Sequence, residues 1–340
     1  MKVGLTGKAF SGKSTIFNAL MELKEGSDTK DRRIGVIPVP DERIDYLSSV
    51  FTPKKTTYAA IQVEEPEVSL ETSKELPNLL GTLRDMDTLC LVLGAFSDPD
   101  VSPLADLRDM LDELKLADLS IIEKRLDRLE RECSKSGESE RLQTFRAHLE
   151  NQDGLIRTLE LDDDDDKLFG GFRFLTEKPM IAVVNQSEDL FLKKAYPDLR
   201  EFAKRHDIHL IEMCAPLEWE ISQLDSENRR EFLDDLNLDQ PAASRFIRTC
   251  YQLLNYISFF TVGADEVRAW PVTRGTTAVK AAGKIHSDIE RGFIRAEVIA
   301  YPDFCQCGSE SEAKARGKAP LEGKTYIVRD GDLMNYKFNV

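Results

Sequence analysis

Residues 7–14 read GKAFSGKS and match the phosphate-binding pattern G-x-x-x-x-G-K-[ST] without a gap. The neighbouring sequence fits this pattern, because residues 3–5 can form a short buried strand and residues 15–23 (TIFNALMEL) read as an amphipathic helix. The glycines let the backbone curl, so that successive N–H groups face phosphates at the positive end of that helix. Strand, loop and helix in this order predict a binding site for a nucleoside triphosphate.

Two side chains of this loop have predicted chemical roles. Lys13 would reach the outer phosphates, and the Ser14 hydroxyl would ligate Mg²⁺. Thr29 is the only Thr in the aperiodic stretch 25–33, where a loop that closes on the last phosphate would offer a second metal ligand. A plain solvated loop is the alternative for that stretch. The predicted nucleotide contacts of the phosphate-binding loop are Lys8, Ala9, Phe10, Ser11, Gly12, Lys13, Ser14 and Thr15.

Length and composition leave room for two domains, since the chain has 340 residues of which 41% are hydrophobic. The net charge of −15 excludes a basic coat for nucleic acid, and neither a membrane nor a DNA sequence is an expected partner. Residues 256–340 carry 12 Lys and Arg against 11 Asp and Glu, so this near-neutral part could still meet RNA. No apolar run approaches 18 residues and the six Cys are scattered, which predicts a cytoplasmic protein with incidental thiols.

Strands and helices alternate over most of the chain. Apolar runs at 34–39, 57–64, 88–96, 179–185 and 209–215 predict strands, and helical patterns lie at 76–86, 192–204 and 245–254. This alternation, with mostly continuous apolar strands, predicts an α/β fold with a doubly wound sheet. The nucleotide is then expected at the carboxyl ends of the strands.

Residues 103–159 have a different character, with long charged helices. An apolar stripe and a Ser/Gly break at 134–137 predict an antiparallel helical hairpin inserted in the sheet domain. The stripe is first of all the core of the hairpin, and partner binding is a secondary hypothesis. Its members are Leu111, Leu114, Leu116, Leu119, Ile122, Leu126 and Leu129. The five acids at 162–166 favour a solvated loop over a metal site, because adjacent carboxylates repel one another.

The end of the predicted strand 57–64 carries the main chemical anomaly. An acid followed by x-x-Gly is expected there, but the sequence reads Glu64-Glu65-Pro66-Glu67. Glu64 stands where the Asp belongs and would hold the Mg²⁺ shell through water. Glu67 stands where a Gly N–H would meet the last phosphate. Lys13 and Glu64 are the candidate catalytic residues, and no residue is an evident general base.

Nearly the whole chain resembles a known family. Residues 264–304 and 321–340 resemble the TGS domain of the YchF-type Obg-like ATPases, which are related to P-loop GTPases, and the runs 35–45, 172–179 and 221–241 match too. The resemblance implies a P-loop nucleotide-binding domain at 1–255 with a helical hairpin at about 104–160. It implies a small α+β, ubiquitin-like TGS domain at 256–340. The ribosome is the partner it suggests, with the TGS domain and hairpin as contact surfaces.

The resemblance also implies how the base is read. Where GTP-binding relatives carry Asn-Lys-x-Asp, this family carries Asn-x-x-Glu and prefers ATP; the matching residues here are Asn185, Gln186 and Glu188. Adenine has no hydrogen-bond donor at N1 or C2. An Asp that accepts hydrogen bonds from guanine therefore has no donor to pair with on adenine. Cys214 and Ala215 stand where the last base-contacting loop of the family lies.

Both switch segments depart from the family pattern, which predicts a diverged member. The leading hypothesis is a Mg²⁺-dependent, ATP-preferring protein with weak hydrolysis that regulates translation on the ribosome. A non-hydrolysing adaptor that senses nucleotide, with Glu67 disfavouring the triphosphate, is an alternative hypothesis. A GTPase is another, if Glu188 accepts from guanine after all.

Overall fold

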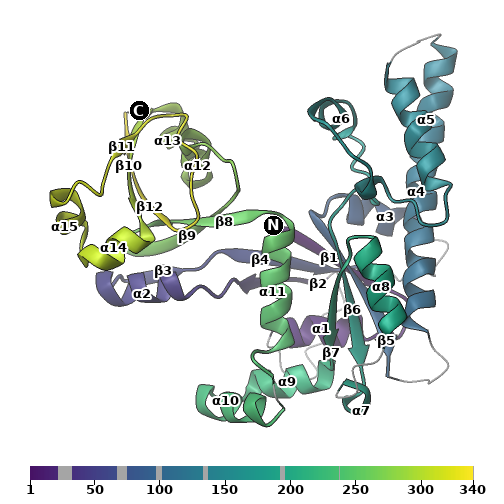
Figure 1. Ribbon diagram of the computed structural model, residues 1–340, viewed down its shortest axis with the longest axis horizontal. Coiled ribbons are helices and arrows are strands. Elements are labelled where there is room, and N and C mark those ends of the chain that lie inside the picture. The colour runs from purple at the N-terminus through teal and green to yellow at the C-terminus, as the bar shows by residue number, and fades with distance from the viewer. Residues whose placement is uncertain are drawn as a thin grey trace. The chain divides into compact units, whose positions relative to one another are not determined.

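The computed structural model describes residues 1–21, 33–66, 75–96, 102–132, 137–191, 196–236 and 238–339. The chain forms two compact units, each built from two separate segments (Figure 1). The first unit comprises Met1–Ile37 and Gln62–Cys250, and the second comprises Pro38–Ile61 and Tyr251–Val340.

The first unit contains a six-stranded sheet in the order β2-β4-β1-β5-β6-β7 (Figure 1). The bounds of its strands are Lys2–Gly7 (β1), Arg33–Pro38 (β2), Ala60–Glu65 (β4), Thr88–Ala95 (β5), Met180–Gln186 (β6) and His209–Met213 (β7). Strand β1 pairs in parallel with β4 and β5, β5 pairs in parallel with β6, and β6 with β7. Their carboxyl ends therefore share one edge of the sheet, and the loops that leave this edge can form one site.

Both faces of this sheet are covered. Alternate residues of β5 point to opposite faces, yet Leu89, Cys90, Leu91, Val92 and Leu93 are all at most 1% exposed. One face packs against α3 (Leu76–Arg84), α4 (Pro103–Arg131) and α8 (Pro197–Arg205) in a single apolar core. Strands buried on both sides explain the continuous apolar runs of the sequence. The other helices of this sheet domain are α1 (Lys13–Leu20), α7 (Glu188–Phe191), α9 (Ala215–Gln223), α10 (Ser226–Asp235) and α11 (Ala242–Leu253).

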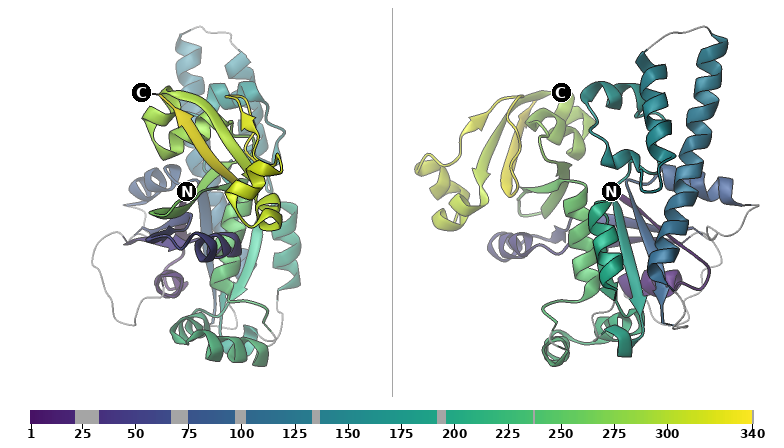
Figure 2. Two further views of the ribbon diagram at one scale, coloured as in Figure 1. Left: turned by 90° about the vertical axis from the view of Figure 1, so that its left-hand side faces the viewer. Right: turned by 45° about the vertical axis from the view of Figure 1, so that its right-hand side comes forward.

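The predicted helical hairpin consists of α4 and α5 (Gly137–Leu149), which lie side by side (Figures 1 and 2). Helix α4 begins after Ser102, whose hydroxyl accepts a hydrogen bond from the Ala105 N–H at 3.3 Å. The far half of the apolar stripe forms the core of the hairpin, together with η1 (Ile156–Thr158) and α6 (Asp163–Phe169). Leu111 and Leu114 belong instead to the core under the sheet. Leu116 is 60% exposed, so its place in the predicted stripe is wrong.

A buried carboxylate ties the hairpin to the sheet domain. Asp118 of α4 is fully buried and accepts hydrogen bonds from Arg84 of α3 at 2.8 Å, from the Leu175 N–H at 3.0 Å and from the Thr176 N–H at 2.8 Å. The Thr176 hydroxyl donates a fourth hydrogen bond, at 2.8 Å. Because a buried charge is tolerated only when it is paired and hydrogen-bonded, this cluster fixes α4 against α3 and the 175–176 backbone.

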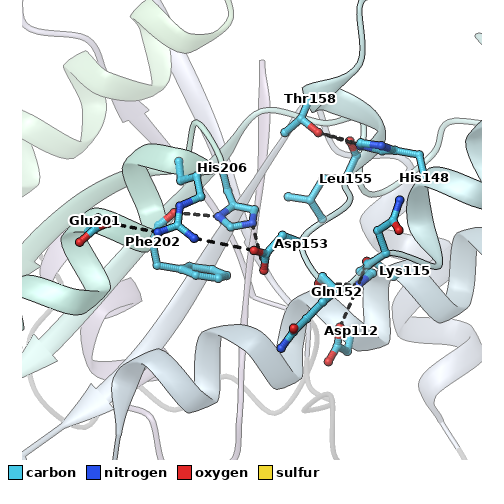
Figure 3. A network of polar contacts seen from close by, with 12 residues as sticks. Asp112, Lys115, His148, Gln152, Asp153, Leu155, Thr158, Glu201, Phe202 and His206 are labelled. Atoms are coloured by element: carbon cyan, nitrogen blue, oxygen red, sulfur yellow. Dashed lines mark hydrogen bonds and ion pairs between the residues drawn. The ribbon is translucent and has the colours of Figure 1, made fainter.

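A second polar joint lies on α4 near the end of α5 (Figure 3). The Lys115 ammonium donates to the carbonyls of Asn151 and Gln152, both at 3.0 Å, and pairs with Asp112. Across a small cavity, His206, which directly follows α8, stacks on Phe202 of that helix and lies 3.7 Å from Asp153. The joint therefore connects α4, the turn after α5 and α8.

The acidic run after the hairpin is helical rather than a loop. Residues 163–169 form α6, and Asp165 accepts hydrogen bonds from Arg141. Within the described parts of the chain, no group of three or more His, Cys, Asp or Glu is placed to hold a metal ion. The helices described here include none that is long and apolar enough to cross a membrane.

The second unit is a six-stranded sheet in the order β11-β10-β12-β8-β9-β3 with short helices. Its strands are Lys55–Thr57 (β3), Tyr256–Thr261 (β8), Glu266–Thr273 (β9), Phe293–Ala300 (β10), Leu321–Glu322 (β11) and Asp332–Phe338 (β12). Its helices are Glu42–Phe51 (α2), Ala278–Ile285 (α12), Ser287–Arg291 (α13), Tyr301–Cys307 (α14) and Glu310–Ala315 (α15). One core lies between α12 and the central strands, with Phe259, Val272 and Ala296 among its members. This is the α+β module that the sequence predicts.

The division of the chain differs from the prediction in two respects, since the second unit begins at Tyr251 instead of residue 256 and also includes an early segment. Residues 38–61 were assigned to the N-terminal domain, but they form part of the second unit. Strand β3 pairs in parallel with β9, and Phe51 at the end of α2 stacks on Phe304 with ring centroids 5.5 Å apart. Arg43 of α2 reaches Asp330 at 3.0 Å. The single strand predicted at 57–64 is therefore two strands, β3 and β4, which belong to different sheets.

Candidate functional site

The phosphate-binding loop follows β1 and leads into α1, as the motif requires. Gly12 has a φ of +85°, a conformation that L side chains rarely adopt. The Lys13 ammonium donates hydrogen bonds to the carbonyls of Gly7 at 3.1 Å and Lys8 at 2.7 Å. The loop therefore curls around the Lys13 side chain, which places one positive charge where phosphates would lie.

Asn185 at the end of β6 connects three loops. Its amide nitrogen donates to the Ser11 carbonyl at 3.3 Å, and its amide oxygen accepts from the Ala215 N–H at 3.1 Å. A Cβ atom on Gly12 would lie 2.1 Å from the same amide nitrogen, so only glycine fits there. Asn185 thus holds the phosphate-binding loop against the loops after β6 and β7. Its role in this structure is to position them.

A pocket of about 320 Å³ lies beside these loops. Of the predicted base-reading residues, Asn185, Gln186, Glu188 and Cys214 line it, as does Thr15 in the first turn of α1. Ala215 is buried and contacts Asn185 through its backbone without lining the pocket. The lining residues that were not among the predicted nucleotide contacts are Phe96, Ser187, Pro216, Leu217 and Glu220.

The character of these walls suits a purine base. Phe96, Pro216 and Leu217 supply apolar surface, and Glu188 and Glu220 are exposed carboxylates that line the same pocket. Burial raises the pKa of the Cys214 thiol, so this thiol stays neutral and adds to the apolar wall. Phe96 could have been found from its place directly after a buried strand, at the edge where parallel strands end.

The predicted Mg²⁺ site differs from the prediction; its residues Ser14, Glu65 and Arg33 are here called the metal corner. The Ser14 hydroxyl donates a hydrogen bond to Glu65 Oε1 at 2.6 Å, and Arg33 Nη1 lies 3.6 Å from Glu65 Oε2. Glu65, and not Glu64, therefore faces the predicted metal ligand Ser14. Neighbouring residues of a strand point to opposite sides, so only one of two adjacent glutamates can do so. Thr29 and Glu67 lie outside the described residues.

Two predicted contacts of the phosphate-binding loop have side chains that are directed elsewhere. The Lys8 ammonium is held by Asp106 at 2.8 Å and Asp109 at 2.7 Å, in the first two turns of α4. Phe10 is 95% exposed, with a φ of +59°. The Lys8 ammonium is therefore occupied within the protein, and the Phe10 side chain lies in solvent. The motif specifies its glycines, lysine and serine and leaves these positions open, so the sequence pattern cannot place their side chains.

Glu218 fixes the helix that carries part of the pocket. This residue of α9 is buried and accepts hydrogen bonds from the N–H groups of Ala242 at 2.8 Å and Ala243 at 3.2 Å, at the start of α11. Burial raises the pKa of the Glu218 carboxyl, although these two hydrogen bonds lower it in part. The carboxylate thereby anchors α9, on which Leu217 and Glu220 lie.

Comparisons with known proteins cover the whole chain. The family model YchF-GTPase_C, described as a protein of unknown function, matches residues 256–339. The "Ribosome-binding ATPase YchF" of Haemophilus ducreyi is 39% identical over 364 residues, which cover 100% of this chain and 99% of the relative. The protein of the same name from Bacillus subtilis is 34% identical over 365 residues, with 100% of both chains covered.

A solved structure agrees with the fold. The Schizosaccharomyces pombe YchF GTPase has a TM-score of 0.85 with this chain at 29% sequence identity, and the match covers 99% of this chain and 97% of that one. The likeness extends over both units, which confirms the predicted fold class. The predicted family resemblance is confirmed as well.

Proposed function

The chain belongs to the YchF family, and from this premise we propose that it binds ATP with Mg²⁺, hydrolyses it weakly and docks on the ribosome. The observation that carries the proposal is the arrangement of Lys13 and the pocket of about 320 Å³. Asn185 lines this pocket and is hydrogen-bonded to the loop that surrounds the Lys13 ammonium. Phosphates and a base can therefore be held together at one edge of the sheet.

The proposed preference for ATP rests on Glu188, the carboxylate expected to face the hydrogen-bonding edge of the base. Glu188 replaces the Asp that accepts from guanine in GTP-binding relatives of the fold, and it is exposed at the pocket. The two bacterial relatives are named ATPases, whereas the Schizosaccharomyces pombe structure is titled a GTPase. Adenine gains nothing from a carboxylate at N1, so loss of the Asp geometry reduces the advantage of guanine.

The residues at the metal corner fit Mg²⁺. Ser14 Oγ and a Glu65 oxygen lie within 2.6 Å of each other, and both are the hard oxygen donors that this ion prefers. Bound Mg²⁺ would supply charge neutralisation for the outer phosphates. Lys13 would add its own positive charge, and the loop backbone would orient the phosphates. With no general base evident, positioning and electrostatics carry the chemistry.

Weak hydrolysis follows from the sequence after β4. Pro66 and the acids around it replace the Asp-x-x-Gly segment whose glycine N–H would order the switch in the triphosphate state. A non-hydrolysing nucleotide sensor remains the second candidate function. Ser14 and Glu65 would have to bind Mg²⁺ during hydrolysis. Here Ser14 is hydrogen-bonded to Glu65, and Arg33 lies beside Glu65, which favours this candidate.

The ribosome is proposed as partner from the names of the bacterial relatives. The helical hairpin and the second unit are the surfaces proposed to contact it, and such a partner would place the protein in the cytoplasm. The net charge of −15 disfavours broad contact with RNA phosphates, so binding must depend on local surfaces.

Equilibrium binding of fluorescent ATP, ADP, GTP and GDP, followed by single-turnover hydrolysis, tests the proposal. We expect ATP to bind more tightly than GTP and to be hydrolysed slowly, and Lys13→Ala to abolish tight binding. Sedimentation with purified ribosomes tests the partner. Unchanged ATP affinity in Lys13→Ala would overturn the site. Binding without any turnover would favour the sensor.

A further inference from the structure

The metal corner brings together Ser14, Glu65 and Arg33. Glu65 Oε1 accepts the Ser14 hydroxyl at 2.6 Å, and Glu65 Oε2 lies 3.6 Å from Arg33 Nη1. The side chains of Glu65 and Arg33 are only 7% and 17% exposed. Within the described parts of the chain, Glu65 Oε2 accepts no hydrogen bond. A buried carboxylate oxygen thus faces a guanidinium next to the predicted Mg²⁺ ligand Ser14.

We propose that Arg33 stands in for the metal: its guanidinium neutralises Glu65 when Mg²⁺ is absent, and Mg²⁺ must compete with Arg33 for this carboxylate. The inference rests on the proposed function, since it concerns the Mg²⁺ that accompanies the nucleotide. It assigns metal contact to Glu65 instead of Glu64. Arg33 then acts through Glu65, and its presence lowers the affinity of the site for Mg²⁺.

The electrostatics of the corner support competition. A buried carboxylate needs a counter-charge, and Arg supplies one at every accessible pH. The Arg33 guanidinium lies 3.6 Å from Glu65 Oε2 and can supply this counter-charge. When Mg²⁺ binds Ser14 and Glu65, two positive groups face one carboxylate at short range, so either the guanidinium moves away or the metal binds less tightly.

The position of Arg33 extends the consequence to the sheet. Arg33 is the first residue of β2, and β2 neighbours β4, which ends at Glu65. Displacement of the guanidinium by Mg²⁺ therefore acts on the start of β2. The segment that precedes Arg33 in the chain is the predicted first switch.

The test measures Mg²⁺ dependence of nucleotide binding and does not rely on turnover. Affinity for fluorescent ADP is measured in excess EDTA and then with Mg²⁺ titrated, for the wild type and for Arg33→Met, Arg33→Lys, Glu65→Gln and Glu64→Gln. Circular dichroism checks that each variant is folded. As a second readout, bound Mn²⁺ is measured by electron paramagnetic resonance without nucleotide.

We expect Arg33→Met to raise the apparent Mg²⁺ affinity by about tenfold, because it removes the competing charge and keeps an unbranched side chain. Arg33→Lys keeps the charge and should stay close to the wild type. Glu65→Gln should lower Mg²⁺ affinity by about tenfold or more, and Glu64→Gln should leave it within about twofold. Mn²⁺ binding should follow the same order.

Other results separate the two levels of the proposal. If the wild type binds ADP and Arg33→Met has wild-type Mg²⁺ dependence in both readouts, the competition is refuted while the proposed function stands. If Arg33→Met weakens ADP binding in EDTA, Arg33 is a phosphate ligand and the inference fails. A larger loss of Mg²⁺ affinity in Glu64→Gln than in Glu65→Gln overturns the assignment of the carboxylate. A folded wild type that binds no nucleotide refutes the proposed function and this inference together.

Discussion

Single contacts decide whether the site can form. Gly12 combines a positive φ with a backbone so close to Asn185 that a methyl group would lie 2.1 Å from the amide nitrogen. The amide nitrogen and oxygen of Asn185 are both hydrogen-bonded to backbone groups, those of Ser11 and Ala215. The residue that the family resemblance assigns to the base therefore acts first as a brace between loops. We therefore expect discrimination between bases to depend on Gln186, Glu188 and the pocket walls.

This division of roles leads to a prediction on base preference. The double variant Gln186→Lys, Glu188→Asp should shift binding toward GTP, because Asp accepts from the guanine donors at N1 and N2. Competition between ATP and GTP for the site measures the shift. Asp189→Asn, a change at an exposed neighbour that does not line the pocket, is the matched control. A wild type that already binds GTP at least about tenfold more tightly, or about 1.4 kcal/mol, would contradict the base-reading argument.

The sequence predicted the residues of the site that a motif specifies and missed those that depend on side-chain direction. Lys13 and Ser14 were predicted, since phosphate chemistry requires these types at this spacing. Glu65 was missed in favour of Glu64, because two adjacent glutamates look alike until the strand register fixes which one faces Ser14. Lys8 was predicted to contact the nucleotide, but two carboxylates of a distant helix hold its ammonium. No local pattern encodes such a pair.

At the scale of elements, α4 takes part in three polar contacts that join it to other parts of the first unit. Lys8 holds its first two turns, Asp118 joins it to α3, and Lys115 joins it to the turn after α5. The sequence predicted the hairpin because its apolar stripe is long and periodic. It did not predict that the stripe divides between two cores, since periodicity shows which face is apolar and not what covers that face.

Loss of the Asp118 charge should loosen this helix. In Asp118→Asn, an amide NH₂ group would face the Arg84 guanidinium and two backbone N–H groups, all of which are donors. We expect the free energy of unfolding to fall by about 3–5 kcal/mol, as for other broken buried ion pairs. Urea denaturation followed by far-UV circular dichroism measures it. Asp127→Asn, at an exposed position of the same helix, should change stability by less than about 0.5 kcal/mol.

The junction of α9 and α11 gives a prediction on pH. Burial raises the pKa of the Glu218 carboxyl above its ordinary value of 4.5, so in the window just above pH 4.5 the folded state binds more protons than the unfolded state. The contribution of Glu218 to the free energy of unfolding therefore declines as pH rises through that window. Glu218→Gln lacks this proton, so the stability difference between wild type and variant should shrink with rising pH.

Urea denaturation at a series of pH values from about 4 to 7 measures this difference. The series begins near the ordinary pKa of a Glu carboxyl and extends upward, because the pKa of Glu218 is raised. Glu220→Gln, at an exposed position on the same helix, serves as control and should run parallel to the wild type. A difference that grows with pH would mean that the Glu218 pKa is lowered by its hydrogen bonds more than it is raised by burial.

For the whole molecule, the interleaving of the two units matters most. The sequence predicted both folds, because each has its own pattern of strands and helices. It assigned residues 38–61 to the wrong unit by chain order. A short amphipathic helix and a three-residue strand carry no signal for which sheet they join. Only the pairing of β3 with β9 and the packing of Phe51 on Phe304 place them.

The second unit should accordingly depend on this early segment. A fragment of residues 251–340 lacks α2 and β3, so we expect it to melt at a lower temperature alone than with a synthetic peptide of residues 38–61. Binding of the peptide to the folded fragment should raise the melting temperature by several degrees, as mass action requires. Thermal unfolding followed by circular dichroism measures it. The peptide with Phe51→Ala should have a smaller effect, and equal melting with and without peptide would contradict the dependence.

The same interleaving determines the order in which parts of the chain can fold during translation. Residues 38–61 leave the translating ribosome early, but the strands they pair with come only after residue 250. At about 5–20 residues per second, the intervening stretch takes on the order of ten to forty seconds to synthesise. For that time Ile44 and Leu47, both fully buried in the finished protein, have no core to enter. The nascent chain thus exposes an apolar segment during this time, and a product truncated before residue 251 lacks the strands with which that segment packs.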